Sequence, residues 1–133
     1  MKKYSLLLLL SLLIIACKEE ENLPDQEPTA LKMIARSWRV QTVFIDEQED
    51  DTGNYANYRF IFNADQTYRF LMPDEIGGYW ELASNANLLI LDRNTDQEQT
   101  VRILELIENA LKLEFSVESE KTGLSLILCE LAP

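Results

Sequence analysis

The chain has 133 residues, a length typical of one domain. Its 23 acidic and 12 basic residues give a net charge of −11, which repels phosphate backbones and argues against nucleic-acid binding. It contains no histidine, and so lacks the commonest general base, the usual activator of a serine or cysteine nucleophile, and the commonest zinc ligand. We therefore expect no enzyme, no cofactor and no metal site.

The N-terminus has the pattern of a secretory signal. Two lysines precede an apolar run, Ser5 to Ile15, that is too short for a membrane-spanning helix of about 20 residues. The run ends in Ile14-Ile15-Ala16-Cys17, which resembles the bacterial lipoprotein box. The resemblance implies cleavage between Ala16 and Cys17, and acylation of Cys17 by diacylglycerol and an amide-linked fatty acid such as palmitate. The competing interpretation is a plain signal peptide with an unmodified cysteine.

Residues 17–28 follow as an acidic, proline-containing stretch that is typical of a disordered tether, with a span of about 20 Å. The chain that begins at Cys17 has a net charge of −13, so lipid rather than charge would hold it at a membrane. Lys18-Glu19-Glu20-Glu21 resembles the acidic export tag of Bacteroidota lipoproteins, although a solvated spacer has the same composition. We expect a lipid anchor in the outer membrane, exposed at the cell surface if the tag functions.

Residues 29–133 form the predicted domain. Residues 29–36 have helical spacing, with Thr29 as the cap and Leu31, Ile34 and Ala35 on one face. A period of two then predicts strands at 37–46, 57–62, 67–72, 78–83, 88–92, 99–106, 110–118 and 123–131. Short polar connections, except for residues 47–56, favour an antiparallel barrel or sandwich.

One hairpin has a predictable register. A three-residue loop, 64–66, pairs Phe62 with Tyr68, Phe60 with Phe70 and Tyr58 with Met72 on one face. The third loop residue of such a hairpin adopts a left-handed conformation that normally requires glycine, so Gln66 costs about 1 kcal/mol there.

Apolar stripes on the other strands predict the core. The first strand presents Trp38, Val40, Thr42 and Phe44 to one face, and the fourth presents Trp80 and Leu82. The seventh presents Leu111, Leu113, Phe115 and Val117. The inward face of 88–92 is left open, because four consecutive apolar residues do not alternate.

Several phrases resemble the lipocalin-like domains of Bacteroidota lipoproteins. They are the Ser-Trp-Arg-Val strand after a short helix, FNADQTY, GGYWEL and ILELIENALKLEF. The matching positions are Trp38, Asp65, Thr67, Tyr68, Gly78 and Trp80, whereas Arg36 and Gln66 replace glycines of the family pattern. The likeness covers residues 31–131 and implies an all-β fold: an eight-stranded antiparallel up-and-down barrel after a short N-terminal helix.

Candidate chemistry is sparse. No serine lies in a G-x-S-x-G elbow. Residues 92–98 alternate oxygen ligands as a calcium loop would, but they lack its central glycine and distal glutamate, so a solvated loop is favoured. The run 46–51 is also interpreted as a solvated loop. Glu130 continues the Leu124-Leu126-Leu128 stripe, and a two-residue turn at 108–109 aligns Arg102 with Phe115, so either charge is a candidate anchor at a barrel mouth or simply marks a strand end.

Two functions remain, both for a monomer. The first is a membrane-anchored binding module that takes a small apolar or amphipathic ligand inside the barrel, through Trp38, Phe60, Phe70, Trp80, Arg102 and Phe115. The second is an accessory lipoprotein with a packed barrel that binds another envelope protein.

Overall fold

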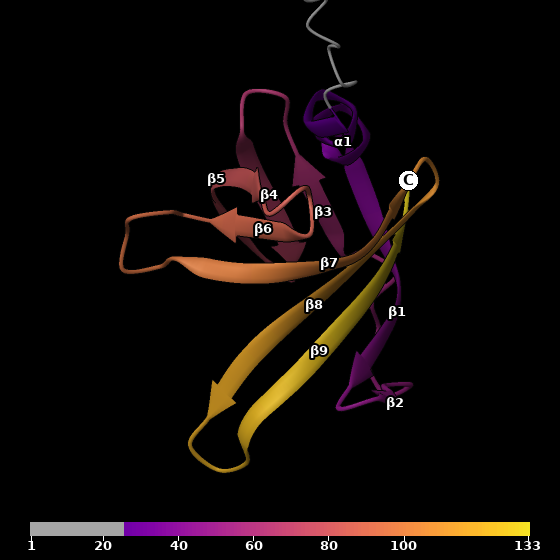
Figure 1. Cartoon of the computed structure of the whole chain (residues 1–133). Coiled ribbons are helices and arrows are strands. Elements are labelled where there is room, and N and C mark those ends of the chain that lie inside the picture. The colour runs from indigo at the N-terminus through magenta and orange to yellow at the C-terminus, as the bar shows by residue number, and fades with distance from the viewer. Residues whose placement is uncertain (1–25) are drawn as a thin grey trace, which may run out of the picture.

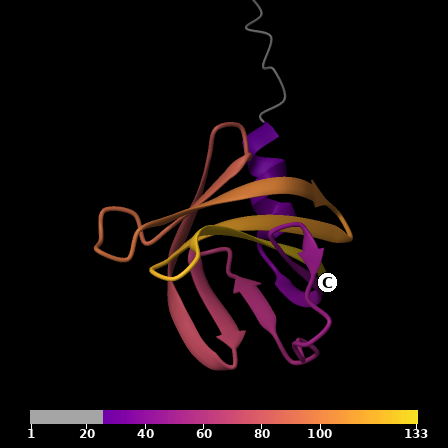
Figure 2. The same ribbon diagram turned by 90° about the horizontal axis from the view of Figure 1, so that it is seen from below.

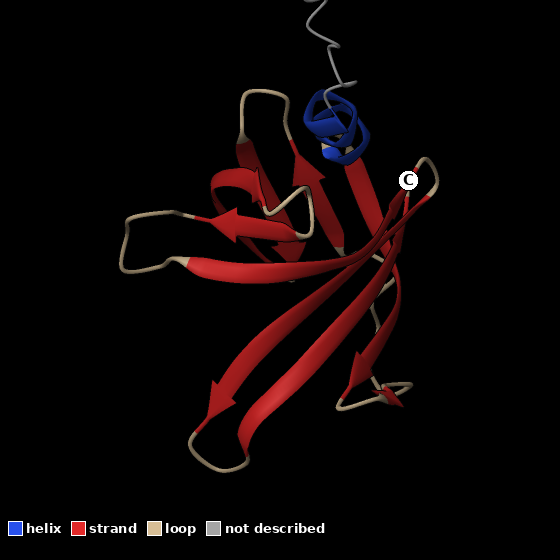
Figure 3. Cartoon of the chain, in the orientation of Figure 1, coloured by secondary structure: helices blue, strands red, loops and turns tan. Residues whose placement is uncertain are grey.

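The structure is a computed structural model that describes residues 26–133, so the predicted signal, Cys17 and residues 18–25 lie outside the described residues. Helix α1 (Gln26–Ile34) precedes nine strands, which Figures 1 and 3 show. Their bounds are β1 (Ser37–Ile45), β2 (Gln48–Glu49), β3 (Arg59–Phe62), β4 (Thr67–Met72), β5 (Asp74–Ala83), β6 (Leu88–Leu91), β7 (Gln99–Ile107), β8 (Ala110–Ser119) and β9 (Gly123–Ala132).

Eight of these strands form a closed antiparallel barrel. Each strand from β3 to β9 pairs with the next along the chain, and β1 closes the ring by pairing with both β3 and β9. The short β2 is an extra strand that pairs with the end of β1. Figure 2, seen from below, shows β3–β5 as one wall and β7–β9 as the opposite wall. The predicted fold class is therefore confirmed.

The predicted strand bounds are confirmed within two residues, with two differences. β5 begins at Asp74 rather than at residue 78, and β2 was not predicted. Within the predicted 46–51 loop, Asp46 and Glu47 both have positive φ and make a two-residue turn that pairs Ile45 with Gln48. Positive φ at both central residues is what a tight hairpin of this twist requires.

Helix α1 covers one end of the barrel. It begins at Gln26, so it includes the last three residues of the predicted tether, and Thr29 lies inside it rather than at its cap. Ile34 is fully buried, and Leu31 and Ala35 pack against the core, as their spacing predicted. Arg36 Nη1 donates to the Glu108 carbonyl at 2.9 Å and joins the helix end to the β7–β8 turn.

The β3–β4 hairpin has the predicted register. Phe60 pairs with Phe70 and Phe62 with Tyr68. Gln66 has φ of 66°, the left-handed conformation expected of the third loop residue.

The predicted inward face of β1 is wrong beyond Val40. The pairing of β1 with β9 shifts between Val40 and Thr42, which is a β-bulge. One extra residue reverses the alternation of the strand. As a result Val43 is buried opposite Cys129, whereas Phe44 lies opposite Leu128 on the outer face.

Candidate functional site

The two ends of the barrel differ in how completely their side chains are buried. Near α1 the interior is an aromatic cluster in which the Phe60 and Phe70 rings stack at 4.4 Å, and Phe62 meets Trp80 edge to face at 5.6 Å. Trp38 Nε1–H donates to the Ile34 carbonyl at 3.0 Å, and Trp80 Nε1–H donates to the Asn63 carbonyl at 3.1 Å. These rings are held by one another and by the backbone, as is usual for core aromatics.

Four of the six predicted ligand contacts belong to this buried layer. They are Trp38, Phe60, Phe70 and Trp80, none of which is more than 4% exposed. Phe115 lies below them, partly buried, with its ring 6.0 Å from Phe60. Phe115 is therefore the predicted contact that lies nearest the other end of the barrel.

At that other end, the inward faces of the strands carry apolar side chains that remain exposed. Ile45 is 41% exposed, Ile76 is 52% exposed and Val117 is 40% exposed. Ile45 pairs with Ile127 and Ile76 pairs with Phe70, while Val117 lies two residues after Phe115 on the same face of β8. Because these three neighbours belong to the core or pack against it, the exposed residues also lie on inward faces. We call this the open end, and it includes the connections 46–58, 73, 92–98 and 120–122 with the strand ends that they join.

Strands β7 and β8 separate at the open end. Their pairing stops at Arg102 with Glu114, although β8 continues to Ser119, and Figure 1 shows the two strands diverging from there. The register shifts between Ile103 and Glu105, a bulge that leaves Leu104 44% exposed. Below the last pair, β8 and β9 project as a two-stranded ribbon, residues 115–127, which we call the ribbon.

The predicted alignment of Arg102 with Phe115 is wrong for the same reason. The bulge moves the register by one residue, so Arg102 pairs with Glu114 on the outer face and binds its carboxylate at 2.6 Å. Arg102 therefore marks the point where the two strands part, outside the barrel. Glu130 shares a face with Leu124, Leu126 and Leu128 as predicted, but this face is also the outer one, where Glu130 lies 3.3 Å from Lys112.

Both faces of the ribbon carry apolar side chains, those of the outer face on β9. The inner face carries Phe115, Val117 and Ile127, and the outer face carries Leu124, 62% exposed, and Leu126, 38% exposed. On the β1 side, the Asp46 N–H donates to the Leu126 carbonyl at 2.9 Å, and the Leu126 N–H donates to Asp46 Oδ1 at 2.8 Å. The Asp46 side chain thus replaces a strand carbonyl and ends the β1–β9 pairing at this residue.

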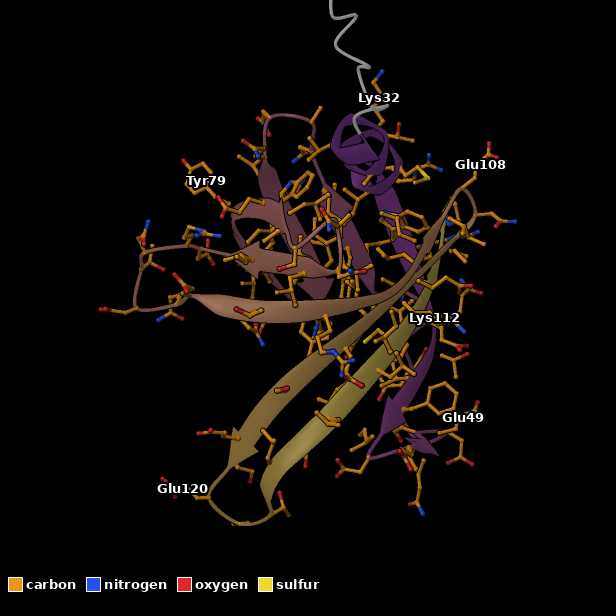
Figure 4. The ribbon with its side chains drawn as sticks, viewed as in Figure 1. Lys32, Glu49, Tyr79, Glu108, Lys112 and Glu120 are labelled. Atoms are coloured by element: carbon orange, nitrogen blue, oxygen red, sulfur yellow. The ribbon has the colours of Figure 1, made fainter. Side chains whose placement is uncertain are left out.

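The open end also holds the net charge of the domain. Residues 46–58, 73–75, 92–98 and 118–122 contain twelve acidic and two basic side chains, whereas the remaining residues of 26–133 contain seven of each. Figure 4 shows Glu49 and Glu120 at this end, far from Lys32 and Glu108 at the other. A potential of one sign around an apolar surface selects partners of the opposite charge.

A pocket of about 420 Å³ lies between β1 and the connection 46–58 of the open end, lined by Arg39, Gln41, Asp50, Gly53, Tyr55 and Arg59 among others. Three of its charged side chains, Arg39, Asp50 and Arg59, have hydrogen-bond partners within the chain, and Arg39 donates to the Pro133 carbonyl. Asp50 accepts hydrogen bonds from Thr52 and Tyr55, which lower the pKa of its carboxyl and raise the pKa of Tyr55 to about 12. Arg59 Nη1 donates to the Ala56 and Tyr58 carbonyls, both at 3.0 Å. The pocket is therefore polar, and Arg39, Asp50 and Arg59 are already engaged within the chain.

Residues 92–98, for which a solvated loop was favoured over a calcium loop, form a hairpin loop closed by its own contacts. Asp92 accepts from the Tyr68 hydroxyl at 2.6 Å and from the Tyr79 N–H at 3.0 Å, and the Asn94 N–H donates to Glu98 Oε2 at 2.7 Å. Across residues 26–133, no group of three or more acidic, cysteine or histidine side chains is arranged to hold a metal ion.

Comparison with family models and with curated proteins found no match to this chain. Within residues 26–133, no helix has the length and apolar character needed to span a bilayer. The exposed residues at the open end were not predicted as site residues. An apolar residue at the exposed end of a strand continues the same alternation as an apolar residue in the core, so the pattern does not distinguish them. The acidic residues beside them in the sequence, Asp46 after Ile45 and Glu75 before Ile76, are the signal that could have located the open end.

Proposed function

We propose that this chain is a non-enzymatic lipoprotein, anchored in the outer membrane through Cys17, whose barrel binds another protein of the cell envelope at its open end. The observation that carries the proposal is the burial difference between the two ends. Inward-facing side chains beside α1 are almost completely buried, while Ile45, Ile76 and Val117 at the open end are 40–52% exposed. Exposed apolar surface rimmed by charge is typical of a protein-binding site.

The ribbon favours a protein over a small ligand. Val117 on its inner face and Leu124 and Leu126 on its outer face are all exposed, so covering them requires a partner that reaches both sides. The aromatic layer that a small ligand would occupy is already filled by contacts among its own rings.

A small apolar or amphipathic ligand is the second candidate. It is favoured by the position of Ile45, Ile76 and Val117 on the inner side of the open end, beyond the partly buried Phe115. A ligand bound there would rest on the aromatic layer without entering it, because that layer is already packed.

The experiment that tests both candidates is photo-crosslinking in the native membrane. A diazirine amino acid replaces Val117 in the full chain, and the same amino acid replaces Tyr79, which is 69% exposed on the outer wall, as the matched control. A protein adduct at position 117 and none at position 79 supports the first candidate. An adduct of small mass at position 117 supports the second, and equal or absent labelling at both positions overturns the proposed site.

A further inference from the structure

Among residues 26–133, no strand pairs with the outer edge of β8 along the ribbon. β8 has β7 on one side only as far as Glu114, and from Phe115 to Ser119 β9 is its single strand neighbour. In an antiparallel strand, the N–H and C=O of successive residues point to opposite neighbours. The two-residue turn at 108–109 directs the backbone groups of Ala110 toward β7, and every second residue of β8 after it points to the same side. Ser116 and Glu118 are among these residues, so their N–H and C=O groups point out of the free edge.

The backbone of β9 follows the same alternation. Leu126 directs its N–H and C=O away from β8, where both groups bind Asp46 on the β1 side. On that side the pairing is terminated by the Asp46 side chain. On the β7 side no such termination is present within the described residues, since β7 leaves β8 beyond Arg102 and keeps β6 beside Gln99–Val101. The β8 edge is therefore the ribbon edge that faces the separation between two strands.

The two faces of β8 along this edge differ in chemistry. Phe115 and Val117 point inward, and Glu114, Ser116 and Glu118 point outward. A strand added to this edge places its alternate side chains directly beside these two rows. Apolar side chains fit the inner row, and basic side chains fit the outer row. Acidic ones would meet Glu118 and the surplus of acidic side chains at the open end.

We propose that the β8 edge at residues 115–119 binds an extended segment of the partner protein, by strand addition, and that this segment alternates apolar and basic side chains. The inference rests on the proposed function and specifies how the partner binds. Main-chain hydrogen bonds to Ser116 and Glu118 supply affinity, and the alternation supplies direction and specificity.

The probe is the peptide acetyl-Lys-Val-Lys-Val-Lys-Val-Lys-amide, added to the full chain in micelles of a neutral detergent, with empty micelles as the blank. We expect saturable binding, slowed hydrogen exchange of the Ser116 and Glu118 amides, and loss of binding at high salt. The matched peptide with glutamate in place of every lysine should not bind, because it meets Glu118 and the surplus of acidic side chains at the open end.

Two proline variants test the edge itself. Ser116→Pro removes one outward-directed N–H from the β8 edge and should weaken binding by about tenfold, since one lost hydrogen bond is of that size. Leu124→Pro removes an N–H from the opposite edge of the same ribbon and should leave binding unchanged. Equal effects of the two variants would overturn strand addition at β8.

A charge variant keeps the test decisive if a proline variant fails to fold. Glu118→Lys should shift preference from the lysine peptide toward the glutamate peptide. An unchanged preference, or no peptide binding by the unmodified chain, overturns this inference. A protein adduct at position 117 in the crosslinking experiment would still support the proposed function, so the two failures are distinguishable.

Discussion

At the scale of single residues, Gly78 shows how one position fixes the local geometry of the barrel. It lies on β5 opposite Tyr68, and a side chain there would collide with the Asp92 carboxylate. The absence of a side chain lets Asp92 approach the sheet and accept from Tyr68 and Tyr79. The sequence marked Gly78 and Tyr68 through the GGYWEL and FNADQTY phrases, but it did not connect either of them with Asp92.

Gly78→Ala should lower the free energy of unfolding by about 1–3 kcal/mol, because the added methyl group displaces Asp92. Urea denaturation measures this free energy of unfolding. In an Asp92→Ala background the same substitution should cost less than about 1 kcal/mol, because the colliding group is gone. An equal cost in both backgrounds would show that the contact is not responsible.

Cys129 gives a pH dependence. Burial raises the pKa of its thiol to about 12, so the folded chain keeps this proton where the unfolded chain, with a thiol pKa of about 8.5, loses it. The stabilisation is complete below pH 8.5 and is lost as pH rises toward 12. Between pH 9 and 10.5, unfolding free energy should fall more steeply than in Cys129→Ala, by up to about 1.4 kcal/mol per pH unit. Parallel curves for the two proteins would contradict this assignment.

At the scale of elements, alternation predicted the strands well and failed wherever a bulge was inserted. The β3–β4 register followed from Phe60, Phe62, Tyr68 and Phe70, because a slip would bury polar residues. The bulges after Val40 in β1 and after Ile103 in β7 could not be predicted, since an extra residue leaves local composition unchanged. The misplaced faces of Phe44 and Arg102 each lie beyond one of these two bulges, whereas Glu130 lies on the outer face of a regular β8–β9 pairing.

The β3–β4 turn offers a stabilising substitution. Gln66 has φ of 66°, and its backbone rather than its side chain makes the turn contacts, donating to the Asn63 carbonyl and accepting from the Trp80 N–H. Gln66→Gly keeps both bonds and removes the left-handed strain, so unfolding free energy should rise by about 1 kcal/mol. Ala64→Gly in the same loop, where φ is not positive, is the control and should be neutral or destabilising. A loss of stability in Gln66→Gly would refute the strain.

At the scale of the whole molecule, the sequence predicted a barrel with a covering helix but not which end is open. The open end depends on where β7 and β8 part and on where Asp46 stops β1, and both are long-range features. The surplus of acidic residues was visible in the sequence, whereas its concentration at one end becomes apparent only when the four loops are brought together by the strands.

The anchor has a direct test. Cys17→Ser should abolish lipid modification and move the chain from the membrane fraction to the soluble fraction, because a single residue supplies the attachment point. Fractionation and the intact mass of the purified chain measure the change. Unchanged membrane partition and mass would refute the assignment.

The anchored chain should also have a preferred orientation. Cys17 precedes α1 by nine residues, a reach of at most about 30 Å. With Cys17 as the proposed anchor, α1 would stay close to the bilayer, and the far ends of ten-residue strands would lie up to about 33 Å further away. A fluorophore on Lys32→Cys should be quenched by spin-labelled lipid headgroups more strongly than one on Glu120→Cys. Equal quenching would exclude the orientation.

The charge distribution adds a consequence of its own. With a net charge of −10 on the described domain placed wholly at the open end, the barrel is an electric dipole along its axis rather than a uniformly charged body. Beside an anionic membrane a uniform charge would only be pushed away, whereas a dipole experiences a torque. That torque turns the acidic end outward within a Debye length of about 8 Å at physiological salt. Under the proposed function, the same acidic loops would both attract a basic partner and turn the open end of the barrel toward it.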